Sequence, residues 1–155
     1  PPPFRPDPAV FARELDAFLS ALPRELTYAV ELRDRALLTG SYARVLARHG
    51  VAHVYNYWTA MPLPGAQSGR VPIETASFCV VRLLHRPGSR YDERRSAFAP
   101  FDRLHDEDPV MRRDVCELLQ RALVQRKESF VLVNNKAEGS SPLTIRALAE
   151  MLAAG

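Results

Sequence analysis

Apolar residues recur along this chain at two spacings, one typical of helices and one typical of buried strands. Steps of three and four residues mark a first helical stripe, formed by Val10, Phe11, Leu15, Phe18, Leu19 and Leu22. A second stripe of the same kind is formed by Val110, Met111, Val115, Leu118, Leu119 and Leu123. An Asp-Pro pair precedes each stripe, Asp7-Pro8 and Asp108-Pro109, and combines a helix N-cap with a proline in the first turn. The pattern therefore predicts two amphipathic helices with defined starts.

Short apolar runs indicate β-strands over residues 26–34, 51–57, 78–84 and 130–133. A helix from about Ser41 to Gly50 lies between the first two strands, and Ser141-Pro142 begins a last helix. Strands that are apolar on both faces and alternate with helices are typical of a parallel sheet covered by helices. The pattern predicts an α/β fold, built either as a doubly wound sheet or as a barrel.

Two connections carry signals of their own. Residues 72–77 fit one or two helical turns. Residues 86–108 are polar with scattered aromatic residues, and this segment is longer than most connections in compact domains. It is either a lid over a site or an ordinary surface excursion.

The number of predicted strands leaves the sheet incomplete. A closed (β/α)8 barrel needs eight strands and typically about 250 residues. Four parallel strands alone have two edges of unpaired backbone groups, so we expect something to cover these edges. The chain begins with Pro1-Pro2-Pro3 and no methionine, and we therefore expect it to be a piece of a longer protein.

Composition narrows the class of protein. The 155 residues are 46% apolar and 25% charged, which is ordinary for one globular domain. The net charge of +3 comes mostly from scattered arginines, which gives weak support for binding to nucleic acid or a membrane surface. Cys79 and Cys116 lack CxxC spacing, which indicates buried, reduced thiols in a cytoplasmic protein. No apolar run reaches the roughly 18 residues of a membrane span.

Charged residues within apolar strands are the first candidates for a site. Glu31 and Arg33 are two residues apart in a predicted strand, so they project from the same face. Arg82 interrupts an apolar run, and burying an unpaired guanidinium costs several kcal/mol. We predict that Glu31 is the partner of Arg82, in either a structural ion pair or a ligand-binding site.

Polar side chains also collect at the ends of three predicted strands. They are Asn56, His85, and the neighbouring Asn134 and Asn135. In α/β folds the carboxyl ends of parallel strands meet at one edge, where ligands bind. Amides both donate and accept hydrogen bonds, which suits sugars, phosphates and carboxylates. His85 is compatible with a general base, a phosphate contact or a structural histidine.

Common catalytic and cofactor motifs are missing from the sequence. No GxSxG, GxxxxGK[ST] or GxGxxG pattern occurs, so serine hydrolase, P-loop and Rossmann functions lack local support. No HExxH, HxxEH or cysteine-rich ligand spacing occurs either. The sequence therefore predicts no dedicated metal site and identifies no cofactor.

Three segments of the chain resemble the carboxyl-terminal half of YecE-like proteins, the family called domain of unknown function 72: YAVELRD, TASFCVVRLLHR and FVLVNNKAEGSSPLTIRALAEML. The resemblance implies the carboxyl-terminal half of a TIM-type (β/α)8 barrel in a bacterial-type protein. Residues 1–155 then form one partial domain whose amino-terminal half is absent, and residues 1–4 follow the fourth barrel strand. The chain departs from the family pattern after Arg33, at Asn56 and at His85-Arg86-Pro87.

These residues support two hypotheses of function. As an enzyme acting on a small polar or anionic substrate, the chain uses Glu31 and His85 as acid and base. Substrate-binding groups are then Arg33, Asn56, Arg82, Asn134 and Asn135. As a noncatalytic module, the same groups bind a metabolite or nucleic acid, with the arginines of residues 90–95 steering the ligand. The macromolecular partner is either the missing amino-terminal half or a second copy at the sheet edges.

Overall fold

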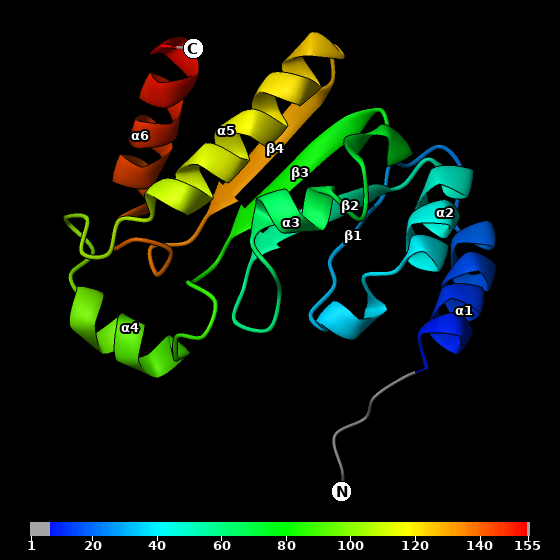
Figure 1. Cartoon of the computed structure of the whole chain (residues 1–155), viewed down its shortest axis with the longest axis horizontal. Helices are drawn as coiled ribbons and strands as arrows, with labels where there is room; N and C mark the ends of the chain where they lie inside the picture. The colour runs from blue at the N-terminus through cyan, green and yellow to red at the C-terminus, as the bar shows by residue number, and fades with distance from the viewer. Residues whose placement is uncertain (1–6, 155) are drawn as a thin grey trace, which may run out of the picture.

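The computed structural model describes residues 7–154 and confirms an α/β fold with a four-stranded parallel sheet (Figure 1). In chain order the elements are α1 (Pro8–Ser20), β1 (Ala29–Val30), α2 (Gly40–His49), β2 (Ala52–Tyr57), α3 (Pro64–Ser68), β3 (Phe78–Leu83), α4 (Tyr91–Phe98), α5 (Pro109–Val124), β4 (Glu128–Val133) and α6 (Ser141–Ala154). Two 3-10 turns, η1 (Arg35–Leu37) and η2 (Ile73–Thr75), complete the set. The η2 turn matches the predicted helical turns, whereas α3 and α4 were not predicted. Residues 1–4, to which the resemblance assigns a place in the barrel, lie outside the described residues.

The strands are arranged in chain order, β1-β2-β3-β4, and every neighbouring pair is parallel. Asn56 is in register with Arg82, and Arg82 with Leu132. The carboxyl ends of the strands therefore meet at one edge, as the sequence predicted for its polar residues.

One face of the sheet packs on helices. Cys79, Val81 and Leu83 of β3 are buried in a core that includes Met111, Val115 and Leu118 of α5. Val80 and Arg82 alternate with these buried residues and are only partly buried. On β4, Phe130 and Leu132 keep 46% and 51% of their surface exposed. The sheet thus has one helix-covered face and one face with exposed apolar side chains.

Strand β1 is much shorter than the predicted run of residues 26–34. Only Ala29 and Val30 pair with β2. Leu32 then turns into a second core formed with α1 and α2. The Asp34 side chain accepts a hydrogen bond from the backbone N–H of Ala36, which starts η1 and leads the chain away from the sheet. Glu31 and Arg33 consequently lie just beyond the strand end.

Both predicted Asp-Pro caps are present. The Asp7 carboxylate accepts hydrogen bonds from the backbone N–H groups of Ala9 and Val10. The Asp108 carboxylate accepts in the same way from Val110 and Met111. Each cap satisfies N–H groups that have no partner within the helix, which explains the sharp starts of α1 and α5. Within residues 7–154, no helix combines the length and apolar character required to cross a membrane.

Candidate functional site

The centre of the candidate site is the Glu31 carboxylate, which two arginines share. Arg33 Nε lies 2.8 Å from Glu31 Oε1, and Arg82 Nη1 lies 2.6 Å from Glu31 Oε2. The predicted pairing of Arg82 with Glu31 is therefore present. Glu31 is 17% exposed, whereas Arg33 and Arg82 are 43% and 41% exposed. The carboxylate thus lies behind the two guanidinium groups, which face the solvent.

Asn56 supports this carboxylate from the neighbouring strand. Its fully buried side chain donates from Nδ2 to the backbone oxygen of Leu32 at 2.7 Å and to Glu31 Oε1 at 3.3 Å. Residues Glu31, Arg33, Asn56 and Arg82 form a connected set that we call the Glu31 site. They come from the carboxyl ends of β1, β2 and β3, so the parallel sheet brings them together.

Trp58, directly after β2, is a site residue that the sequence did not single out. The Arg33 guanidinium lies over its ring at 4.1 Å from the centroid, in cation–π geometry. The Trp58 and His85 rings also pack in a T-shaped arrangement, with centroids 4.5 Å apart. The position of Trp58 immediately after a strand end was the only signal in the sequence that could have identified it.

His85 lies at the same edge but inside the protein, with 3% of its surface exposed. Its Nδ1 lies 3.0 Å from Ser89 Oγ and 3.4 Å from Thr59 Oγ1. Burial and the positive charge of Arg94 lower the pKa of this imidazole below its usual value. His85 is therefore neutral at pH 7 and contacts the Glu31 site through Trp58.

Asn134 and Asn135 lie at the expected edge, and their side chains make local hydrogen bonds. Asn134 Oδ1 accepts from the backbone N–H of Lys136 at 3.0 Å. Asn135 Oδ1 accepts from both the backbone N–H and the hydroxyl of Ser141, at 2.8 and 2.6 Å. Asn135 thereby caps α6. Asn134 also lines a small cavity of about 210 Å³ together with Arg82, so it is the nearer of the two amides to the Glu31 site.

The segment between β3 and α5 is anchored to the strand ends. Buried Arg94 of α4 donates to the backbone oxygens of Lys136 and Ala137, both at 2.7 Å. Its remaining guanidinium nitrogen pairs with Asp106, which also pairs with Arg86. Figure 1 shows α4 beyond the arrowheads of β3 and β4. These contacts join α4 and the loop that follows it to the segment after β4.

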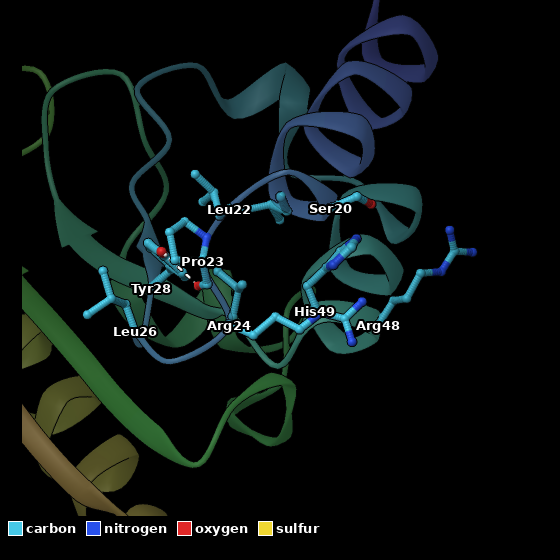
Figure 2. Close-up of a pocket in the computed structure, with 10 residues that line it drawn as sticks. Ser20, Leu22, Pro23, Arg24, Leu26, Tyr28, Arg48 and His49 are labelled. Carbon is cyan, nitrogen blue, oxygen red and sulfur yellow. Dashed lines mark hydrogen bonds between the residues drawn. The ribbon is translucent and has the colours of Figure 1, made fainter.

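A separate pocket of about 430 Å³ lies at the opposite end of the sheet, between the ends of α1 and α2 (Figure 2). Arg24, Arg48 and His49 lie on its rim. Asp16 pairs with both Arg48 and His49, at 2.6 and 2.7 Å. The carboxyl end of α2 also points a negative helix dipole at this rim. The pocket includes no residue of the Glu31 site.

Metal-ligating side chains are dispersed through the described part of the chain. Within residues 7–154, no group of three or more His, Cys, Asp or Glu side chains is placed to hold a metal ion. Cys79 and Cys116 are free and buried, and burial raises the pKa of the Cys79 thiol to about 11. The Glu31 site itself presents guanidinium, carboxylate and amide groups, with the Trp58 indole beside them.

Comparison with known families gives one result. The model of the family described as protein of unknown function DUF72 matches residues 1–155, which confirms the family resemblance of the sequence at this level. Comparison with curated proteins and with solved structures finds no match.

Proposed function

The chain belongs to the DUF72 family, and we propose that its Glu31 site binds a small anionic ligand through Arg33 and Arg82. The observation that carries the proposal is the sharing of one carboxylate by two partly exposed guanidinium groups. Two positive charges face one negative charge, which leaves the site one positive charge in excess. Guanidinium groups bind carboxylates and phosphates through paired hydrogen bonds, so a small carboxylate, sulfate or phosphate ester suits the excess charge.

The surroundings favour a ligand with a flat or apolar part beside its charge. Trp58 forms one wall and also holds Arg33 by its ring face. The cavity beside Arg82 adds Leu132 and Asn134 as further contacts. Such a combination of few polar groups with apolar walls is common in ligand sites.

The contacts favour binding over acid-base catalysis. Glu31 Oε2 already accepts a charge-assisted hydrogen bond from Arg82, and Oε1 pairs with Arg33 and accepts a hydrogen bond from Asn56. Buried His85 reaches the site through the Trp58 ring. A general base needs hydrogen-bond reach to the proton that it removes. We therefore assign Glu31 the role of arranging the arginines and His85 that of supporting Trp58.

Removal of Arg82 tests this proposal. We expect Arg82→Gln to weaken binding of sulfate or phosphate by about tenfold, because it deletes one of two charged donors. Calorimetric titration at low ionic strength measures the change. Arg70→Gln, at an exposed position outside the site, is the matched loss of charge and should leave affinity within about twofold. A wild-type chain that binds none of these anions at millimolar concentration would contradict the proposal.

We also propose that the sheet is the carboxyl-terminal half of an eight-stranded barrel. An open groove of about 580 Å³ runs between α1 and the free edge of β1, with Phe11, Leu15 and Phe18 in its wall. Many exposed apolar side chains lie on the elements at the two sheet edges: Val10 and Phe18 of α1, Phe130 and Leu132 of β4, Ile145 and Met151 of α6. These surfaces suit additional parallel strands.

The helices favour a complementary half over a second copy as the partner. In a (β/α)8 barrel one helix covers each crossover between strands. Helix α1 precedes β1 and α6 follows β4. A symmetric pair of copies would bring α6 of one and α1 of the other to the same crossover. An amino-terminal half that ends in a strand and uses α1 as its crossover to β1 would place only one helix at each crossover.

Without such a complement, we expect the 17.4 kDa chain to self-associate as its concentration rises, because its apolar face is exposed. Leu132→Lys should lower the apparent mass measured by light scattering. Val124→Lys changes another exposed apolar residue, outside this face, and serves as the control. A wild-type chain that stays monomeric at about 0.1 mM, a concentration at which exposed apolar surfaces associate, would argue against an open sheet.

A further inference from the structure

Gln67 is a fully buried amide in α3 whose hydrogen bonds converge on Asn56. Its Oε1 accepts from the backbone N–H of Asn56 at 3.2 Å, and its Nε2 donates to the backbone oxygen of Asn56 at 2.6 Å. Nε2 also donates to the backbone oxygen of Pro62 at 2.7 Å. One side chain therefore holds both backbone polar groups of the residue that supports Glu31.

The early end of β1 explains why Asn56 needs this partner. The backbone N–H of Ala52 donates to Tyr28, so the backbone groups of Ala52 point toward the β1 side. Asn56 is four residues further along the strand and points to the same side. The β1–β2 ladder has already ended at the pair Val30–His53. The Gln67 amide takes the place that a peptide group of β1 would occupy.

The orientation of the Gln67 amide is fixed by its partners. Two backbone oxygens face Nε2, so Oε1 faces His53 Nε2 at 3.1 Å. His53 consequently carries its hydrogen on Nε2, and its Nδ1 accepts from the Tyr42 hydroxyl at 3.0 Å. Burial lowers the pKa of His53 to about 4, so the network is neutral at pH 7.

We infer that Gln67 is a positioning residue of the Glu31 site, acting through Asn56. By holding the Asn56 backbone, Gln67 fixes the origin of the side chain that contacts Leu32 and Glu31. Glu31 in turn sets the places of Arg33 and Arg82. The effect on ligand affinity rests on the proposed anion binding, whereas the effect on the side chains of the site does not.

The substitution Gln67→Glu replaces the side-chain NH2 donor by a carboxyl oxygen and keeps the size of the side chain. Burial raises the pKa of the introduced carboxyl group. At pH 5.5 it is protonated and donates its one hydrogen to the backbone oxygen of Asn56 or Pro62, whereas at pH 8 it is ionised and repels both oxygens. In the wild type the groups in contact with Gln67, His53 and through it Tyr42, are neutral over this range, and Glu31 is a carboxylate that also acts on His53. The packed helix α5 places its nearest charges, Asp114 and Arg121, against Gly65 and Ser68 instead.

The experiment combines side-chain NMR with sulfate titration, since sulfate keeps its charge between these pH values. Relative to wild type at the same pH, we expect the Asn56 amide and Arg82 Nε–H resonances to move at pH 8 and not at 5.5. Sulfate affinity should fall about fivefold at pH 8 and stay within twofold at pH 5.5. Gln120→Glu makes the same chemical change at an exposed position of α5 and is the control.

Different outcomes separate the two proposals. If Gln67 is only structural, the variant melts at a lower temperature while both resonances and the affinity match wild type, which overturns the inference. If the wild type binds no anion, the proposed function fails and the resonances still decide the role of Gln67. Should the variant unfold at pH 8, Gln67→Met gives a second reading, because this uncharged change should displace both resonances at either pH.

Discussion

Replacing Glu138 by glutamine should lower the free energy of unfolding by about 3 to 5 kcal/mol, the usual cost of breaking a buried ion pair from one side. Glu138 is fully buried in the loop after β4. Its carboxylate lies 2.9 Å from Arg112 Nε and accepts from the backbone N–H of Asp108 at 2.7 Å. An amide would turn a donor toward one of these two donors. The loss should be large because Arg112 has little solvent access to compensate it.

Denaturant titration at pH 7 measures this loss, and the melting temperature should fall by roughly 10 °C. Glu150→Gln is the matched control, because Glu150 pairs with Arg146 at 2.7 Å on an exposed face of α6. Exposed pairs contribute about 1 kcal/mol or less. Equal stability of the two variants would mean that Glu138 does not hold the start of α5 to the β4–α6 loop.

The order of the four strands and of α1, α2, α5 and α6 was predictable because its signals are local. Asp7 and Asp108 cap helices through backbone groups two and three residues away. The apolar run of β2 likewise reflects burial of consecutive residues, whereas burial alternates along β3 and β4. The length of β1 was not predictable, because the turn at Asp34 competes with the ladder and the sequence alone does not rank the two.

The Glu31–Arg82 pair was predictable for an energetic reason, since a guanidinium in an apolar strand requires a partner. Gln67 gave no such signal. It lies in a short helix within a loop. Its role depends on β1 being too short to pair with Asn56 of β2, which is a property of the tertiary structure. Asn135 gave a signal that had two possible meanings. An amide after a strand is equally suited to binding a ligand and to accepting a hydrogen bond from the first residue of the next helix, here Ser141.

Glu31→Gln tests whether the carboxylate competes with an anionic ligand for the two arginines. If Glu31 only arranges the arginines, loss of its charge removes the anion that now competes for Arg33 and Arg82. The excess positive charge of the site rises from one to two. We therefore expect sulfate to bind about thirtyfold more tightly, a change of about 2 kcal/mol. The amide keeps one acceptor for the arginines, so their placement is largely retained.

Calorimetric titration of sulfate measures this gain, and the added affinity should weaken as ionic strength rises. Asp34→Asn removes one negative charge close by in the chain while leaving the Glu31 contacts in place, and it controls for a general change in charge. Weaker sulfate binding by Glu31→Gln would contradict the expected competition between the carboxylate and the ligand for the two guanidinium groups. A tighter complex would favour a site whose arginines receive the ligand.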